Sequence, residues 1–450
     1  MSVRRGTAGP GVSVVVTGYG SVSAYGLGLA GLEAALRAGR PLLTEIDRSA
    51  GYHQADPSAR LALRAPTQNL APWLQPGEAR RMSPPSKLAV AAARQALAMA
   101  GLASPEGRVA AEPEAGSEEL DDPGRSTAVV LANSFGPSSF TEHLMRQILL
   151  ESPEAASPFY FTECVANAPA AQIAIAARAR GANITVVQRE AGPLLAVAKG
   201  AAEVVSGRAR RALVGAAEEM TPLLHSFLDR FGALSRGGCG AGEEGEVARP
   251  FDRRRDGFLA AEGAVVWVLE RESDARERGA RPIARVAGWA SAFDPTAPPT
   301  DWGHGGPALA RGLVRGLSRF GLAPAAIDRI VSGASGSVAG DRLEASVLTS
   351  TWAGQALPPV LAPKGVTGEY GGGHLASALL AACSAELGPT AGFSETDPEL
   401  GLVPHDGRHL PSPRRVLATG LAAGGAATWL VLESMGESIP GAAADGGAEA

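Results

Sequence analysis

Short runs of apolar, β-branched residues alternate with alanine-rich stretches of helical periodicity along most of the chain. This alternation predicts an α/β fold in which the inner strands are mostly parallel. We predict strands at 13–17, 127–132, 184–188, 211–215, 264–270, 283–288, 328–333, 359–362, 415–419 and 428–433. Helices are predicted at 28–37, 86–99, 168–180, 193–206, 307–320, 342–352 and 374–386.

The elements recur in similar order and spacing in two halves, which indicates an internal duplication. We place the halves at 12–272 and 273–433. The acidic stretch near 104–124 has few large apolar residues and is predicted to be a surface insertion within the first half. Residues 1–11 and 434–450, which are rich in Gly, Ala and Pro, are predicted to be flexible tails.

Composition excludes several classes of protein. Of the 450 residues, 45% are hydrophobic and 19% charged, and the net charge of −5 argues against nucleic acid as a partner. Cys164, Cys239 and Cys383 are too far apart for a disulfide framework or a zinc site, so we expect no metal and a reducing cytoplasm. Because no apolar run reaches 18 residues, we expect no membrane contact.

A glycine-rich segment at 17–23 follows the first strand and invites comparison with a dinucleotide-binding loop. Ser23 stands where the GxGxxG pattern requires its third glycine, so the signal is weak. We interpret the segment as a tight turn between a strand and a helix and expect no cofactor.

Four blocks in order make the chain resemble the ketosynthase family, the β-ketoacyl carrier-protein synthases. They are VVVTGYGSVSAYGLG at 14–28, SPFY at 157–160 followed by Asn167, RPFDRRRDGF at 249–258 followed by Glu262-Gly263-Ala264, and KGVTG at 364–368. The resemblance covers about 12–433. It implies a thiolase-like fold, in which two pseudo-duplicated α/β halves form five layers, αβαβα.

The resemblance also assigns the catalytic positions, and none of them is intact. The family's nucleophilic cysteine corresponds to Glu190, in the string Arg189-Glu190-Ala191-Gly192-Pro193. Its two histidines correspond to Gly333 and Glu369, whereas Lys364 is retained. His374 replaces the second histidine only if the alignment slips across 371–373.

The glycine-rich block at 423–427 lacks the family's gating phenylalanine and its asparagine. A carboxylate accepting an acyl group from a thioester would form an anhydride, which lies uphill. We therefore expect no independent condensing activity. Glu190 either stabilises the start of a helix or fills the old oxyanion hole, and Lys364 beside Glu369 is equally consistent with a structural ion pair.

An inactive ketosynthase can still pair with an active one. In type II polyketide synthases this partner is the chain-length factor, or β subunit, whose side chains shape a tunnel at the interface. The resemblance implies an obligate heterodimer with an active ketosynthase α subunit, and an acyl carrier protein whose phosphopantetheine carries the chain. It places the following side chains at this tunnel or interface: Phe135, Phe140, Leu144, Ile148, Tyr160 and Cys164.

Phe140, Leu144 and Ile148 are spaced i, i+4, i+8, which predicts one face of a helix, although ordinary core packing would give the same pattern. Two other functions stay open. The first is the decarboxylation of malonyl carrier protein to make starter units, although the ketosynthase-like decarboxylases that do this keep their histidines. The second is that of an interaction protein unrelated to chain length.

Overall fold

The computed structural model describes residues 12–53, 58–109, 126–237, 245–383 and 387–436. Most of the predicted insertion, the first tail and most of the second lie outside these residues. Ser434 and the two residues after it are described, and Ser434 still belongs to the last strand, one residue beyond the predicted strand end.

One large mixed sheet dominates the described structure, in the order β12-β11-β13-β14-β10-β1-β9-β7-β5-β6, with β2 beside β1. Its strands are β1 (Val14–Ser23), β2 (Gly26–Leu27), β5 (Thr127–Asn133), β6 (Asn183–Val187), β7 (Arg211–Glu218), β9 (Gly263–Arg271), β10 (Ala284–Phe293), β11 (Arg329–Val331), β12 (Val360–Leu361), β13 (Arg415–Leu421) and β14 (Ala426–Ser434). A second, small sheet contains β3 (Thr44–Glu45), β4 (Leu61–Leu63) and β8 (Ala260–Ala261).

The large sheet consists of two five-stranded runs with the same topology. In the first run the order is β6-β5-β7-β9-β1, and in the second it is β12-β11-β13-β14-β10. When the five strands of each run are counted in chain order, the third strand (β6 or β12) lies at the outer edge of the sheet. The first strand (β1 or β10) lies at the inner edge, where the two runs meet. The runs join where β1 pairs antiparallel with β10, with Val14 opposite Val286 and Val16 opposite Ala284. This shared topology confirms the predicted duplication within the fold.

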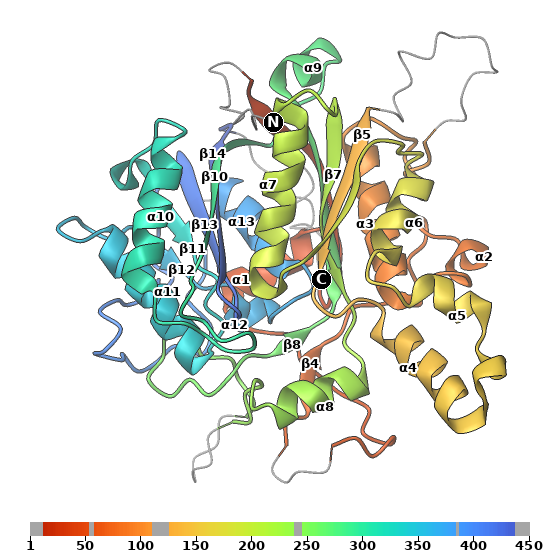
Figure 1. Ribbon diagram of the computed structural model, residues 1–450. Coiled ribbons are helices and arrows are strands. Elements are labelled where there is room, and N and C mark those ends of the chain that lie inside the picture. Colours follow the sequence, from red (N-terminus) through yellow and green to blue (C-terminus); the bar gives the residue numbers. More distant parts are fainter. Residues whose placement is uncertain (1–11, 54–57, 110–125, 238–244, 384–386, 437–450) are drawn as a thin grey trace, which may run out of the picture.

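The helices complete five layers (Figure 1). Helices α3 (Pro84–Met99) and α6 (Ala168–Ala176) cover the first run, α10 (Gly306–Ser318) and α11 (Val338–Thr351) cover the second, and α7 (Gly192–Val205) and α13 (Gly373–Cys383) lie between the runs. The predicted αβαβα architecture is thus confirmed. The other helical segments are α1 (Ala30–Ala38), α2 (Pro76–Ala79), α4 (Ser138–Arg146), η1 (Gln147–Glu151), η2 (Pro153–Ala155), α5 (Pro158–Glu163), η3 (Arg189–Ala191), α8 (Pro222–Arg230), α9 (Glu272–Glu277), η4 (Pro324–Ala326) and α12 (Lys364–Thr367).

Alternation along the strands distributes the core between the layers. In β5, Val130 and Ala132 face the central helices, whereas Val129 and Leu131 face α3 and α6. Both faces are covered, and so the strands appear in the sequence as continuous apolar runs. The central helix α13 is buried all round, which explains its alanine-rich composition.

Three details of the sequence-based fold prediction were wrong. The middle of the sheet is antiparallel: β13 returns to β14 through a short turn, and β7, β9, β1 and β10 pair antiparallel as well. The glycine-rich segment at 17–23 lies within β1 and is not a turn. A Cβ on Gly18 or Gly20 would lie 2.2 or 1.9 Å from a carbonyl oxygen of α3, so these glycines permit close packing of that helix. Helix α11 begins at Val338, before the predicted start, because the Ser337 hydroxyl caps it by accepting from the Gly340 N–H.

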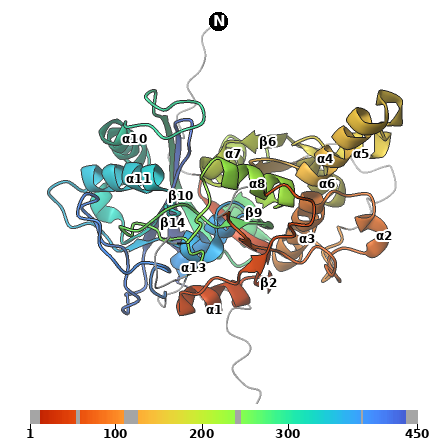
Figure 2. The same ribbon diagram turned by 90° about the horizontal axis from the view of Figure 1, so that it is seen from below.

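An arm made of α4, η1, η2 and α5 projects at the edge of the molecule beyond α6 in both views (Figures 1 and 2). The segment η1 is a π-helix, which interrupts the predicted continuous helix through Ile148. Within the described ranges, no helix is both long and apolar enough to cross a lipid bilayer.

Candidate functional site

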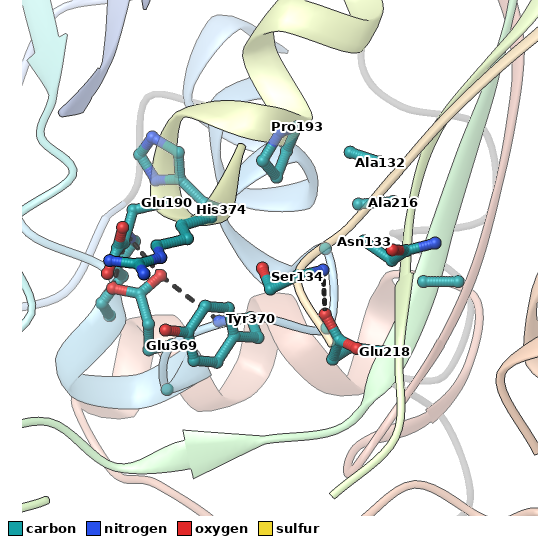
Figure 3. Close-up of a pocket in the computed structure, with 16 residues that line it drawn as sticks. Ala132, Asn133, Ser134, Glu190, Pro193, Ala216, Glu218, Glu369, Tyr370 and His374 are labelled. Carbon is teal, nitrogen blue, oxygen red and sulfur yellow. Dashed lines mark hydrogen bonds and ion pairs between the residues drawn. The ribbon is translucent and has the colours of Figure 1, made fainter. Parts of the chain in front are cut away.

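The candidate site is a cavity at the ends of several strands of the first half. Its wall is formed by the end of β5, the turn η3 with Pro193, the end of β7 and the segment that runs from Lys364 to His374. Only about 20 Å³ of free volume remains inside, which is enough for a water molecule but not for an acyl chain. Figure 3 shows the side chains that fill it.

Glu190 lies in the turn η3, directly before the central helix α7. The preceding residue, Arg189, has a left-handed backbone with φ of 44°, so the chain turns sharply here, as it leaves β6. Glu190 is 8% exposed, and its Oε2 has no hydrogen-bond partner. Burial, together with the nearby negative charge of Glu369, raises the pKa of Glu190 to about 7. Because a carboxyl with this pKa is only partly ionised near neutral pH, Glu190 stabilises the N-terminus of α7 less than an exposed glutamate would.

Lys364 and Glu369 form a buried ion pair at the opposite wall. Both Glu369 carboxylate oxygens accept from the Lys364 Nζ, at 2.7 and 2.8 Å, and both side chains are at most 3% exposed. The position that resembles a catalytic histidine therefore holds an anion paired with the retained lysine. The ion-pair interpretation of Lys364 describes the observed geometry.

His374 also lines the cavity. Whether it replaces the family's second histidine depends on a shift in the alignment, and this stays a prediction. His374 sits in the first turn of α13, and its Nε2 is 2.8 Å from the carbonyl oxygen of Thr419. Since a carbonyl only accepts, Nε2 carries the proton and the unpartnered Nδ1 is an acceptor. Burial and the charge of Lys364 lower the pKa of His374 to about 3, so the ring is neutral.

Gly333 is closed in by the strand beside it. Its N–H donates to the Thr419 hydroxyl at 3.1 Å, and a Cβ at this position would lie 2.8 Å from the Thr419 carbonyl oxygen. The Thr419 hydroxyl in turn donates to the buried carboxylate of Glu344. The position that the resemblance assigns to the family's first histidine thus has no side chain and no space for one unless β13 shifts.

Two buried acids that the sequence analysis missed hold residues 134–139, the segment after β5 that we call the rim of the cavity. Glu218 ends β7 and accepts from the N–H groups of Ser134 (2.6 Å) and Phe135 (3.3 Å), while Glu219 accepts from the N–H of Ser139 in the first turn of α4. Burial raises the pKa of Glu218 to about 8 and that of Glu219 to about 7. In the sequence, nothing indicated that Glu218 and Glu219 would be buried, because two adjacent acids after an apolar strand are usually exposed. Tyr370, on the floor of the cavity, was missed as well.

The predicted tunnel residues are divided between the rim and the arm. Phe135 is 37% exposed at the rim, and its ring meets that of Tyr370 edge to face at 5.0 Å. Phe140 packs on Phe159 and Tyr160 within the arm. Leu144 is buried, Ile148 is half-buried in the π-helix, and Cys164 ends α5 with its thiol directed to the Phe161 carbonyl. The structure thus does not bring these six side chains together in one pocket.

Of the two remaining cysteines, Cys383 is not among the residues that line the cavity. Cys383 is a half-buried residue at the end of α13, and burial raises its pKa to about 12. Cys239 lies outside the described residues. Across the part of the chain that the structure describes, no three His, Cys, Asp or Glu side chains are grouped so that they could hold a metal ion.

Comparison with known proteins identifies the class to which this fold and site belong. The family described as "Beta-ketoacyl synthase, N-terminal domain" matches residues 12–275. The chain therefore belongs to the β-ketoacyl synthase family.

The chain is similar to the tetracenomycin polyketide synthase ketoacyl synthase beta subunit of Streptomyces glaucescens, with 33% identity over 88% of this chain and 92% of that protein. It is 30% identical to the 3-oxoacyl-[acyl-carrier-protein] synthase 2 of Rhizobium meliloti, over 70% of this chain and 72% of the relative. Among solved structures, the ishigamide ketosynthase/chain length factor superposes with a TM-score of 0.80 and 29% identity, covering 94% of this chain and all of the other. This superposition confirms the predicted thiolase-like fold.

Proposed function

We propose that the chain is a chain-length factor, the non-catalytic subunit that pairs with an active ketosynthase in a type II polyketide synthase and shapes the tunnel for the growing polyketide chain. The observation that carries the proposal is the filled cavity. The buried carboxyl of Glu190 occupies the turn that the resemblance assigns to the family's thiol, and the cavity is too small for an acyl chain. The similarity to a ketosynthase beta subunit supports the same conclusion.

The apolar surface of the arm supports the partnership. Leu149, Leu150 and Phe161 are 77%, 70% and 64% exposed, and large exposed apolar patches commonly mark protein interfaces. The nearby strand β6 ends the sheet among the described residues, with Val187 54% exposed. An edge strand of this kind can continue a sheet into a partner. We expect an obligate interface of more than roughly 2,000 Å².

Co-expression with an active type II ketosynthase and a carrier protein tests the proposal. The two ketosynthase-like chains should purify together in equal amounts, and condensation should require both. Purification of this chain free of the ketosynthase, with full condensing activity in the ketosynthase alone, would contradict the proposal.

One observation favours a second function, the decarboxylation of malonyl carrier protein to make starter units. His374 supplies a neutral imidazole with a free acceptor to the cavity, and Lys364 supplies a cation. The small free volume and the pairing of Lys364 with Glu369 weigh against it. Incubating the purified chain with malonyl carrier protein distinguishes the two functions, because rapid release of CO₂ without the partner occurs only for a decarboxylase.

A further inference from the structure

The arm leaves the body of the molecule and returns to it at almost the same point (Figure 2). Gly136, before α4, lies against Ala166, after α5, and a Cβ on Gly136 would be 3.2 Å from the Ala166 Cα. The Asn133 side chain, at the end of β5, donates to the Ala166 carbonyl at 2.6 Å. Because both ends of the arm meet here, the arm can tilt about this base unless further contacts fix its angle.

The arm has a small core of its own. Phe140 of α4 packs on Phe159 and Tyr160 of α5, with ring centres 6.0 and 5.0 Å apart. The ring of His143, one turn further along α4, lies 4.2 Å from that of Tyr160. These contacts join α4 to α5, so a tilt about the base moves the two helices together.

Glu163, the last residue of α5, ties the arm to the body. It is 3% exposed. Its Oε2 accepts from the Ser83 N–H (2.9 Å), the Ser83 hydroxyl (2.9 Å) and the Ser86 hydroxyl (2.8 Å), and its Oε1 accepts from the Gln172 side chain (2.7 Å). Ser83 and Ser86 belong to the start of α3, and Gln172 belongs to α6. One carboxylate thus joins the last helix of the arm to both helices that cover the first run.

The same carboxylate completes the N-terminus of α3. Ser83 is the N-cap residue of this helix, and its own side chain does not cap it. In a capping box, a glutamate within the helix accepts from the N–H of the N-cap residue, and here Glu163 does so from another helix. It also brings a negative charge to the positive end of the dipole of α3. A buried carboxylate is costly unless its hydrogen bonds are made, so these bonds hold the end of α5 in one position.

A second buried acid fixes the other end of the arm. The Oε1 of Glu219, which is 2% exposed, accepts from the Ser139 N–H at 2.9 Å and from the Ser139 hydroxyl at 3.1 Å, in the first turn of α4. The most exposed apolar side chains of η1, Leu149 and Leu150, lie in the chain between these two anchored ends.

From these contacts we infer that Glu163 is a positioning residue, which holds the arm at the angle that the partner subunit requires. The inference rests on the proposed function, because the partner must bind the arm. An arm that tilts would present Leu149 and Leu150 in the binding geometry for only a fraction of the time, and the apparent affinity would fall by that fraction. Glu163 acts through the arm and is itself buried behind it.

Hydrogen exchange of the chain alone tests the anchoring. Glu163→Ala removes all four hydrogen bonds, so amides of 138–163 should exchange roughly tenfold faster than in the wild type, while those of β9 and α7 stay unchanged. Glu163→Gln keeps an oxygen for Ser83 and Ser86 and should behave as the wild type. Gln172→Ala removes only the Oε1 bond, spares the N-terminus of α3 and should give a smaller increase in the same amides. Unchanged exchange in the arm, or faster exchange throughout the chain, would overturn the inference.

The affinity for an active type II ketosynthase tests the consequence for the partner. The Kd of Glu163→Ala should rise roughly tenfold at a temperature well below unfolding, where a change in stability alone leaves nearly every molecule folded and Kd unaltered. Glu163→Gln and Glu154→Gln, which changes an exposed carboxylate of the arm, should bind as the wild type does. Equal Kd values for Glu163→Ala and the wild type would overturn the inference. A wild-type chain that binds no ketosynthase would refute the proposed function, whereas the exchange of the arm would still decide whether Glu163 anchors it.

Discussion

At the scale of single residues, Glu190 makes the stability of the chain depend on pH. Its folded-state pKa of about 7 lies above the usual 4.5, so between these values the folded chain binds more protons than the unfolded chain. Stability therefore falls as pH rises from about 5 to 8, and Glu190→Gln removes this contribution. Urea unfolding should show the variant gaining roughly 1–3 kcal/mol on the wild type between pH 5 and pH 8.

A matched control for this experiment is Glu151→Gln, which changes an exposed carboxylate on the arm. It should leave the pH dependence of the unfolding free energy as it is in the wild type. If Glu190→Gln differs from the wild type by the same amount at both pH values, Glu190 is charged throughout and its raised pKa is wrong.

Restoring the family's catalytic residues should not restore condensation. In the triple variant Glu190→Cys, Gly333→His, Glu369→His, the new side chain at 333 would collide with the Thr419 carbonyl, 2.8 Å from its Cβ. Product formation from acyl and malonyl carrier proteins should stay at background. The double variant without Gly333→His avoids the collision and provides a folded control. Turnover by the triple variant would show that β13 can move aside.

Of the positions that the resemblance singled out, Glu190, Lys364 and Glu369 line the described cavity, whereas Gly333 is not among its lining residues. The sequence could not show what surrounds them. The approach of Thr419 to Gly333 depends on the pairing of segments 86 residues apart in the sequence, and the position of His374 in the same cavity as Glu190 likewise depends on packing between elements far apart in the sequence.

At the scale of elements, the arm should contribute to partner binding more than to stability. Leu149→Asp with Leu150→Asp places charges on the most exposed apolar side chains of η1. Because a charge is costly to bury in an apolar interface, the variant should lose the ketosynthase partner in co-purification while its thermal unfolding stays within a few degrees of the wild type. The control variant Val403→Asp changes a valine that is 59% exposed and distant in sequence from the arm, and it should leave the complex intact. Retention of the partner by the double variant would exclude this surface from the interface.

Phe140 in α4 tests whether the arm forms part of the tunnel. Phe140→Ala removes a ring that packs on Phe159 and Tyr160, and the enlarged space should lengthen the products of the complex. The product range is measured by mass spectrometry beside Phe293→Ala, which removes an exposed ring (62%) from β10. Unchanged products from an intact complex would indicate that Phe140 only supports the arm.

Most elements could be predicted from pattern alone, because strands such as β5 and helices such as α13 are buried and correspondingly apolar. The strand directions could not, since apolar runs do not show whether neighbours are parallel. The π-helix η1 could not either, because Phe140, Leu144 and Ile148 keep an α-helical spacing across it.

At the scale of the whole molecule, the two halves should fold as one unit. The pairing of β1 with β10 joins their strands, and α7 of the first half packs against β10, β13 and β14 of the second. A fragment of residues 1–272 would expose both surfaces and should lack the near-ultraviolet circular dichroism of a packed core. The full chain should unfold in a single transition that different probes report identically. Two separate transitions would show that the halves are independent.

The contact between Gly333 and Thr419 has a consequence for how the chain can change. A side chain can be gained by one substitution as long as its place is open. Here a neighbouring carbonyl stands 2.8 Å from where a Cβ would be, so any side chain introduced at 333 would meet a steric barrier before it offered a benefit. The packing of β13 thus behaves like a ratchet: a single substitution at this position is blocked, and a second change that moves the strand aside would have to come first.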